Sequence, residues 1–290
     1  MKSADIVEAT RKILSEYGYA LTLRQIFYRL VSNYGLSNTG ATYRYLSRIL
    51  VNARENGIIP VNSIIDRSRS IIPSYDNDDG DPDDYFDLEI ESIEDMALSY
   101  SMSMWDNQDY YIEVWVEKDA LSQVVSRVAR DFKVVVAPSR GYSSFSYLYD
   151  AVKRFKSVDS EKNRLVLHFG DHDPSGIDMS RDLEERLNNY GANIELVRVA
   201  LTYDQVKQYK LSPNPTKTAD PRSNGYISMF GSECWELDAL PPNVLQKLVS
   251  DSIQSYIDKD KWEAKEDEIE DNRQIIQDKV DEFFDKARRS

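Results

Sequence analysis

The chain has 290 residues, of which 41% are hydrophobic and 30% charged, and its formal net charge is −14. This composition is ordinary for a globular protein, and the length allows one large domain or two smaller ones. No apolar run reaches the length of a membrane span, and the first residues show no signal-peptide core. The single cysteine, Cys234, excludes an intramolecular disulfide, so we expect a protein of the reducing cytoplasm rather than a membrane or secreted protein.

The charge is unevenly distributed along the chain. Residues 1–70 contain ten Lys or Arg and five Asp or Glu, a local charge of +5, which leaves −19 for the remainder. Between residues 70 and 117 there is no basic residue. We therefore expect a basic module at residues 1–70, an acidic connector at residues 71–107 and a further domain at residues 108–290. We interpret the connector as a solvated linker; the alternative is that it mimics DNA and covers the basic face in the absence of substrate.

The basic module is predicted to contain three helices followed by a short hairpin. The spacing of apolar residues predicts helices at residues 4–17, 23–34 and 41–55, with Thr22 as the N-cap of the second. Residues 58–65 are apolar and β-branched, and Pro60 interrupts them, which suits the edge of a hairpin. Three helices and a hairpin in this order are typical of a winged-helix domain.

The third predicted helix carries arginines opposite its apolar face. Leu46 and Leu50 lie on one side of it, and Arg44 and Arg48 lie on the other. Arginine pairs well with phosphates and with guanine edges, so these side chains are candidates for contact with DNA. The candidate DNA-binding residues of the module are Arg44, Arg48, Arg67 and Arg69. The alternative is a solvated arginine face on a protein-interaction module.

Tyr28 occupies an unusual place in the second predicted helix. At about 100° per residue, it lies away from the apolar stripe, and Arg24 lies one turn before it on the same flank. We therefore expect an exposed phenol beside a guanidinium. The chain has 19 tyrosines, most of which must serve packing. A nucleophilic role for Tyr28 is thus one hypothesis, and a packing role is the other.

From residue 108 onward the chain alternates strands and helices. Strands are predicted at residues 110–117, 133–137, 164–169 and 193–200, with helices between them. This alternation predicts an α/β fold with a parallel sheet and helices on both faces. Residues 134–136 and 165–167 are continuously apolar, as strands covered on both sides require. A charged amphipathic helix at residues 261–288 is predicted as a packing or dimer-contact element.

Acidic side chains follow two of these strands. Glu117 ends the first strand, and Asp171 and Asp173 follow the third. The carboxyl ends of parallel strands meet at one edge of a sheet, so we expect the three carboxylates to lie together and to form an oxygen site suited to Mg²⁺. The alternative for the two aspartates is a structural role at the start of a helix.

Two neighbours of these acids are further candidates. Arg140 lies in the turn after the second strand, at the same edge of the sheet, and is a candidate for contact with DNA. His172 lies between the two aspartates. Three roles stay open for His172: a residue beside the aspartates that tunes them, a proton donor to a leaving group, or a partly exposed spacer.

Several motifs resemble the family of the topoisomerase VI A subunit and the related meiotic double-strand-break protein. The N-terminal segment Arg24-Gln-Ile-Phe-Tyr28 is similar to the Arg-x-Ile-[Tyr/Phe]-Tyr motif of that family. Further similar segments, in the same order, are Val116-Glu-Lys118, Gly170-Asp-His-Asp-Pro-Ser-Gly176, Leu201-Thr-Tyr-Asp-Gln-Val-Lys-Gln-Tyr-Lys-Leu211 and Leu237-Asp-Ala-Leu-Pro-Pro242. A glutamate after the first strand and Asp-x-Asp after the third form the Toprim pattern. The resemblance covers most of the chain apart from the acidic connector and the last helix.

The resemblance implies a winged-helix domain followed by a Toprim domain, and Mg²⁺-dependent cleavage of double-stranded DNA. By position, Tyr28 would be the nucleophile that forms a 5′-phosphotyrosyl bond, and Arg24 would position the phosphate. Glu117, Asp171 and Asp173 would hold Mg²⁺. The resemblance also implies a homodimer in which the tyrosine of one protomer meets the acids of the other, with an ATPase B-type subunit as a candidate partner.

The chain is shorter than the A subunits of that family and contains no ATPase segment. The resemblance therefore favours DNA cleavage over strand passage. Two other functions stay open from the sequence. One is a metal-dependent nuclease that uses water, with Tyr28 in a structural role, and the other is a DNA-binding dimer without catalytic activity.

Overall fold

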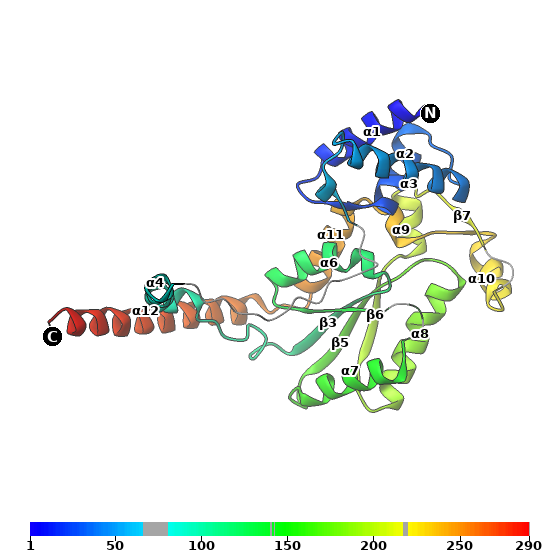
Figure 1. Ribbon diagram of the computed structural model, residues 1–290. Coiled ribbons are helices and arrows are strands. Elements are labelled where there is room, and N and C mark those ends of the chain that lie inside the picture. The colour runs from blue at the N-terminus through cyan, green and yellow to red at the C-terminus, as the bar shows by residue number, and fades with distance from the viewer. Residues whose placement is uncertain (66–80, 140, 142, 217–219, 290) are drawn as a thin grey trace. The chain divides into compact units, whose positions relative to one another are not determined.

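The computed structural model describes residues 1–65, 81–139, 141, 143–216 and 220–289 (Figure 1). The chain divides into two compact units, Met1–Arg69 with Tyr110–Tyr256 and Ser70–Asp109 with Ile257–Ser290. It is an α/β protein whose four-stranded parallel sheet is flanked by helices, and it has a long C-terminal helix. Among the described residues, no helix combines the length and the apolar character that crossing a membrane requires.

Three helices form the N-terminal part of the first unit: α1 (Ser3–Ser15), α2 (Leu23–Tyr34) and α3 (Gly40–Glu55). The predicted N-cap of α2 is confirmed, because Thr22 Oγ1 accepts a hydrogen bond from Gln25 N at 3.1 Å and the Gln25 side chain accepts one from Thr22 N at 2.9 Å. The helices pack on buried aliphatic side chains, namely Ile6, Ile13, Ile26, Leu30, Leu46 and Leu50. The fold thus buries the apolar faces that the spacing predicts.

The predicted hairpin after α3 is wrong for the described residues. β1 (Leu21–Thr22) pairs in parallel with β2 (Ile64–Ile65), which follows the 3₁₀ helix η1 (Val61–Ser63). Leu21 and Ile64 are both buried and lie opposite each other in this pair. The partner strand therefore comes from the residues before α2. Residues 66–70 lie outside the described residues.

The predicted parallel sheet is confirmed. Its strand order is β4 (Val135–Pro138), β3 (Tyr110–Val116), β5 (Asn163–Phe169) and β6 (Glu195–Ala200). The central position of β5 explains why residues 165–167 are buried, as predicted. The same prediction for residues 134–136 is wrong, because β4 is an edge strand in which Val135 is 42% exposed.

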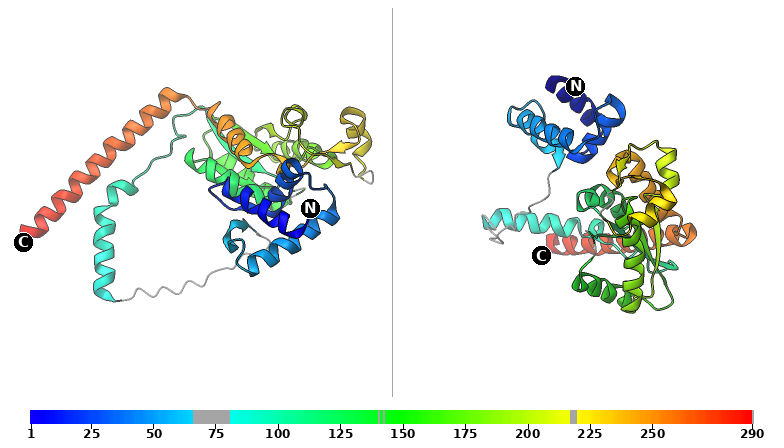
Figure 2. Two further views of the ribbon diagram at one scale, coloured as in Figure 1. Left: turned by 90° about the horizontal axis from the view of Figure 1, so that it is seen from above. Right: turned by 90° about the vertical axis from the view of Figure 1, so that its right-hand side faces the viewer.

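Helices cover both faces of the sheet (Figures 1 and 2). On one face α6 (Asp119–Asp131) contacts α11 (Pro242–Gln254), and on the other α7 (Phe145–Ser157) contacts α8 (Pro174–Asn189). Trp115 of β3 and Val166 of β5 belong to the hydrophobic cluster on the side of α7 and α8. Burial of apolar surface on both faces holds the ends of the central strands at fixed positions.

A buried carboxylate also ties α7 to the sheet. Glu113 of β3 is fully buried, and Arg154 donates to both of its oxygens at 3.0 Å. Tyr111 Oη and Trp115 Nε1 donate to the same carboxylate at 3.0 and 2.9 Å. Because this charge is paired and both oxygens are hydrogen-bonded, its burial is tolerated.

The segment after the sheet meets the N-terminal helices. Its elements are α9 (Tyr203–Gln208), β7 (Asn214–Pro215), α10 (Ser223–Phe230), β8 (Glu233–Cys234) and the 3₁₀ helix η2 (Leu237–Ala239). Arg29 of α2 donates to the carbonyl oxygen of Ala239 at 2.5 Å. Asn38 Nδ2 donates to the carbonyl oxygen of Pro213 at 2.7 Å. These bonds dock α2 and the turn after it on residues that follow β6.

The second unit contains α4 (Pro82–Glu94), α5 (Met96–Ser99) and α12 (Lys259–Arg289). Figure 2 shows α12 as one long helix, and α12 contacts both α4 and α5. Part of the predicted linker is therefore helical, although no residue of α4 is buried. In α12, Ile269 and Val280 are buried whereas Phe283 is 55% exposed, so the predicted packing face is covered only in part.

Candidate functional site

The carboxyl ends of β3 and β5 lie side by side, and two of the predicted acids follow them. Val116 pairs with Phe169 in the sheet, and Glu117 N donates to Phe169 O at 2.8 Å. The Glu117 carboxylate then accepts a hydrogen bond from Asp171 N, with 2.9 Å between Oε2 and N. The register of the sheet therefore brings Glu117 and Asp171 together, as predicted.

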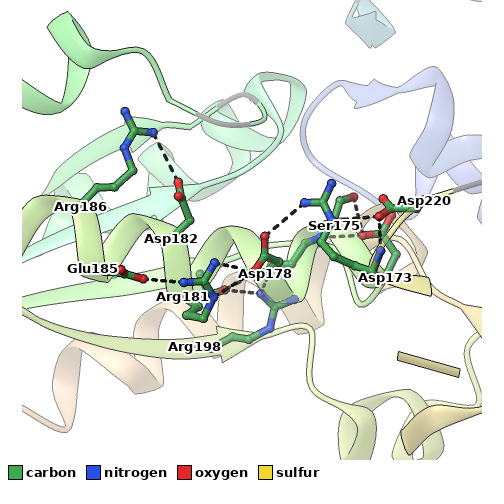
Figure 3. Close-up of polar contacts among 12 residues, drawn as sticks. Asp173, Ser175, Asp178, Arg181, Asp182, Glu185, Arg186, Arg198 and Asp220 are labelled. Atoms are coloured by element: carbon green, nitrogen blue, oxygen red, sulfur yellow. Dashed lines mark hydrogen bonds and ion pairs between the residues drawn. The ribbon is translucent and has the colours of Figure 1, made fainter. Parts of the chain in front are cut away.

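Asp173 caps α8. Its Oδ1 accepts hydrogen bonds from Gly176 N at 2.7 Å and from Ser175 Oγ at 2.9 Å. Gly176 has no room for a side chain, because a Cβ there would lie 2.2 Å from Asp171 O. Figure 3 shows Asp173 and Ser175 together at the start of the helix, with ion pairs further along it among Asp178, Arg181 and Glu185. The capping role predicted as the alternative is present at Asp173.

A partly buried arginine holds the backbone of the acidic turn, residues 170–176, which carries Asp171 and Asp173. Arg198 of β6 donates to Gly176 O at 2.9 Å and to Asp171 O at 2.5 Å. Burial lowers the pKa of Arg198, while the carboxylates, Glu117 first among them, oppose that shift. The guanidinium thus fixes the backbone of the turn and supplies positive charge beside its acids.

The two acids at the strand ends have raised pKa values. Burial, and then the charge of Asp171, raise the pKa of Glu117 to about 7. Burial raises the pKa of Asp171 to about 6, although Lys118 and a hydrogen bond from Leu237 N at 2.7 Å oppose the rise. Both shifts arise first from burial, which disfavours the charged form, and the neighbouring donors and cations offset it only in part.

Lys118 places an ammonium group among three carboxylates. Its Nζ lies 3.1 Å from Asp171 Oδ1, 2.8 Å from Glu236 Oε2 and 2.7 Å from Asp238 Oδ2. Burial disfavours the charged form, but these carboxylates outweigh burial and raise the pKa of Lys118 well above its ordinary value. In the described part of the chain, Asp238 Oδ1 is buried without a hydrogen-bond partner.

Arg24 connects this cluster to α2. Its guanidinium forms an ion pair with Glu236 and lies over the ring of Tyr43, 5.2 Å from the ring centroid. Burial alone would raise the pKa of Glu236, but Lys118 and Arg24 lower it. A continuous polar chain therefore runs from Asp171 through Lys118 and Glu236 to Arg24.

The predicted exposure of Tyr28 is wrong, because its side chain is only 2% exposed. Asn214 Nδ2 of β7 donates to Tyr28 Oη at 2.7 Å, and the ring lies edge-on to that of Phe27. Burial, and then the charge of Glu236, raise the pKa of Tyr28 to about 12, while Asn214 and Arg24 oppose the shift. A strand distant in sequence thus covers the flank of α2 that faces away from its apolar stripe.

One cavity of about 1400 Å³ brings the predicted residues together. Tyr28 and Arg24 of α2 line it, and so do Glu117, Asp171 and Asp173 at the edge of the sheet. Its wall also includes Tyr43, Lys118, Asn214, Cys234, Glu236 and Asp238. Residues from the N-terminal helices and from the strand ends therefore face one common volume.

The donor atoms of this cavity fit a divalent cation in charge and in type. Of the residues that line it, seven are Asp or Glu and three are Lys or Arg. Carboxylate oxygens are the ligands that Mg²⁺ prefers, usually one or two of them with several waters. Across the described ranges, no three Asp, Glu, His or Cys side chains converge closely enough to hold a metal ion. The predicted convergence of three carboxylates is therefore not present in the described residues: Glu117 and Asp171 are neighbours, whereas Asp173 caps α8.

His172 lies among aromatic side chains. It is 2% exposed, its Nδ1 is 2.7 Å from Tyr226 Oη, and its ring centroid is 4.7 Å from that of Phe230. Burial, and then Arg198, lower the pKa of His172 to about 4. The prediction of a partly exposed spacer is therefore wrong, and the neutral ring anchors the acidic turn to α10.

The predicted DNA-binding arginines are described only in part. Arg44 and Arg48 are exposed on α3, one turn apart, as predicted. Arg67, Arg69 and Arg140 lie outside the described residues. The exposed pair on α3 is therefore the portion of this surface that the structure places.

Sequence reasoning misses Lys118, Asn214, Glu236 and Asp238 as residues of the cavity. Lys118 and Asp238 lie within segments that resemble the topoisomerase VI A subunit, and Glu236 directly precedes one of them. Charged residues inside otherwise apolar segments were the available signal. No signal exists for Asn214, because its bond to Tyr28 spans 186 positions.

No protein-family model matches the chain, and no curated protein is similar to it. Any assignment of function therefore rests on the cavity and on the sequence motifs.

Proposed function

We propose that the protein cleaves double-stranded DNA in a Mg²⁺-dependent reaction in which Tyr28 forms a 5′-phosphotyrosyl bond. The proposal is carried by one observation, that Tyr28 and Arg24 line the same cavity as Glu117, Asp171 and Asp173. The order of the motifs, which resembles that of the topoisomerase VI A subunit, supports it. On this proposal the N-terminal helices are a winged-helix domain and the sheet belongs to a Toprim domain.

The residues of the cavity have distinct roles in this reaction. Tyr28 Oη attacks the phosphorus and loses its proton to water, and the 3′ oxygen leaves and gains a proton from water. Arg24 donates hydrogen bonds to the non-bridging phosphate oxygens. Glu117 and Asp171, with Asp173, would hold Mg²⁺, and the ion would supply stabilisation of the negative charge that develops in the reaction.

Tyr28 has to be activated for this reaction. At a pKa of about 12, only about one phenol in 10⁵ is ionised at pH 7. Asn214 and Arg24 already favour the ionised phenol, so activation requires that the effect of Glu236 be reduced and that a phosphate reach the buried hydroxyl. We also propose that the protein acts as a homodimer on double-stranded DNA, with an ATPase B-type subunit as a candidate partner. The resemblance implies that the tyrosine of one protomer meets the acids of the other, whereas in this structure Tyr28 lines the same cavity as the acids of its own protomer.

The burial of Tyr28 favours a second candidate function. If its hydroxyl stays bonded to Asn214, the acids at the strand ends serve a metal-dependent nuclease in which water attacks the phosphodiester. Tyr28 is then a packing residue, and neither DNA end carries protein.

Cleavage of supercoiled plasmid in the presence of Mg²⁺ separates these functions. We expect Tyr28→Phe to lose cleavage by at least roughly 10³-fold, because it removes the nucleophile. We also expect wild-type cleavage to give DNA ends that enter a gel only after protease digestion. Asp171→Asn should lose cleavage because it removes a carboxylate of the proposed ion site.

Tyr43→Phe is the matched control for the tyrosine substitution. Tyr43 lines the same cavity beneath Arg24, and the substitution removes the same kind of hydroxyl, so cleavage should resemble that of the wild type. If Tyr28→Phe cuts as well as wild type and leaves protein-free ends, the nuclease is the correct function. If wild type shifts the DNA in a gel but never cuts it, the protein only binds DNA.

A further inference from the structure

Two cations of the cavity converge on one carboxylate oxygen. Glu236 Oε2 forms an ion pair with Arg24 Nη1 and lies 2.8 Å from Lys118 Nζ. The side chains of Arg24 and Glu236 are 39% and 24% exposed, so both remain within reach of solvent and of a ligand in the cavity. An oxygen anion held between a guanidinium and an ammonium group has the chemical surroundings of a phosphate oxygen in a binding site.

The two cations are also held by groups other than Glu236. Lys118 keeps Asp238 Oδ2 at 2.7 Å and Asp171 Oδ1 at 3.1 Å. An ammonium group has three donor hydrogens, so the loss of Glu236 would free one of them without releasing Lys118. Arg24 keeps its position over the ring of Tyr43. Both cations can therefore stay in place when the Glu236 carboxylate turns away.

We propose that Arg24 and Lys118 form a subsite for one phosphate of the DNA backbone, and that Glu236 occupies this subsite until DNA arrives. The inference rests on the proposed function for the identity of the ligand, a phosphodiester. It adds Lys118 as a phosphate-binding residue and Glu236 as an internal competitor. An incoming phosphate displaces the Glu236 carboxylate and takes its place between the two cations, so one negative charge replaces another.

Competition of this kind predicts that removal of the Glu236 charge strengthens DNA binding. Glu236→Gln keeps the size of the side chain but cannot form an ion pair with Arg24 or Lys118. We expect it to bind a fluorescein-labelled DNA duplex roughly fivefold to tenfold more tightly than wild type. The measurement is fluorescence anisotropy at low salt with a chelator, so that no cleavage occurs. Glu236→Ala should act in the same direction, which keeps the test available if one variant folds poorly.

Glu233→Gln is the matched control. Glu233 is exposed in β8, three residues before Glu236, and the substitution makes the same change in net charge. Its effect on binding should be within about twofold. A double-mutant cycle then locates the effect, since the gain from Glu236→Gln should shrink in an Arg24→Gln or a Lys118→Gln background.

The subsite would be overturned if Glu236→Gln and Glu236→Ala bound the duplex with the affinity of wild type. It would also be overturned if Glu233→Gln gained as much affinity as they do, or if the gain in affinity were unchanged in both double-mutant backgrounds. A duplex that binds none of these proteins at low salt would also overturn it. A different result would contradict the proposed cleavage reaction, namely that the Tyr28→Phe variant still cuts DNA. The binding test uses neither Mg²⁺ nor Tyr28 chemistry, so the two failures are distinguishable.

Discussion

At the residue scale, the carboxylates at the strand ends are held close together under partial burial. Glu117 accepts a hydrogen bond from Asp171 N at 2.9 Å, and Arg198 and Lys118 approach the same turn from two sides. Burial raises the pKa of Glu117 to about 7 and that of Asp171 to about 6. The folded protein therefore binds protons that the unfolded chain releases at lower pH.

This difference predicts a pH dependence of stability. At these two carboxylates the folded protein binds more protons than the unfolded chain between about pH 5 and pH 8, so they lower the free energy of unfolding as the pH rises. Two histidines, His168 and His172, act in the opposite direction below about pH 6.5, because their pKa values in the folded protein are about 3 and about 4. The contribution of Glu117 is therefore given by a difference between variants: relative to wild type, Glu117→Gln has no proton to release at this position and should gain stability as the pH rises over this range. Urea denaturation in the presence of a chelator measures both slopes.

Glu185→Gln is the control for this measurement, because the Glu185 side chain is 59% exposed on α8. It should follow the wild-type curve. Added Mg²⁺ should raise the stability of the wild type at pH 8 more than that of Glu117→Gln, because ion binding favours the ionised carboxylates. Equal pH slopes for wild type and Glu117→Gln would show that Glu117 does not titrate in this range.

The residue scale also shows where sequence reasoning succeeds and where it fails. Glu117 and Asp171 could be predicted as neighbours because strand ends in a parallel sheet share an edge. The burial of Tyr28 could not be predicted, because the spacing of residues along α2 shows which face each side chain lies on but not which other segments cover that face. Asn214 and the strand β7 cover the flank that the spacing leaves open. Contacts between distant segments decide burial there.

At the element scale, the start of α8 sets the shape of the acidic turn. Gly176 is the third residue of that helix, and a Cβ on it would lie 2.2 Å from Asp171 O. Alanine normally gains about 1 kcal/mol over glycine inside a helix. Here the contact with backbone outweighs that gain, because the turn would have to shift away from Arg198.

We therefore expect Gly176→Ala to lower the free energy of unfolding by about 1 to 3 kcal/mol. It should also lower DNA cleavage, because the backbone of Asp171 moves. Urea denaturation and the plasmid assay measure the two effects. Gly225→Ala in α10 is the matched control, since nothing lies within 4 Å of its Cβ position. A Gly176→Ala protein as stable as the Gly225→Ala protein would contradict the close contact.

Most elements could be predicted because their signals are local. The N-cap Thr22, the apolar stripe of α2 and the apolar run in β5 each arise from a few adjacent residues. The failures at β2 and β4 have one cause. An apolar strand has the same kind of sequence whether it pairs with a hairpin partner, with a distant segment or with only one neighbour. The position of the strand in the sheet decides how exposed its side chains are.

At the scale of the whole molecule, charge is separated along the chain. Residues 1–70 carry +5 within a protein of net charge −14. In the second unit, α4 has acidic residues in its first turn and no basic residue in its last. Binding of DNA through the N-terminal arginines is therefore expected to be weak, because the acidic remainder repels DNA, and to weaken further as salt rises, because each arginine that contacts a phosphate releases counterions.

The substitutions Arg44→Gln and Arg48→Gln test this surface. Each should reduce the slope of log affinity against log salt by about 0.9 if its side chain contacts one phosphate. Arg181→Gln is the control, since Arg181 is exposed on α8 but paired with Asp178 and Glu185. Anisotropy of a labelled duplex over a salt series gives the slopes. Slopes equal to that of wild type would place the phosphate contacts elsewhere.

The grouping of residues 70–109 with residues 257–290 could not be predicted from the sequence. Neither segment contains a sequence pattern that indicates which other segment it packs against. The amphipathic face of α12 is compatible with several neighbours. The acidic composition of the connector predicted solvation, and α4 indeed buries no residue. The amino-acid composition of a segment thus indicates whether it is exposed to solvent. Which other segment it packs against can be learned only from the folded structure.

The single cysteine has a practical consequence for measuring motion in this protein. Burial, and then Asp173, raise the pKa of Cys234 to about 11, so only about one thiol in 10⁴ is ionised at pH 7. Maleimide dyes should therefore react much faster with cysteines introduced at exposed positions, such as Ala41 of α3 and Glu185 of α8. A dye pair at those positions can report by energy transfer, with the native thiol left in place, whether the distance between α3 and α8 changes when DNA binds.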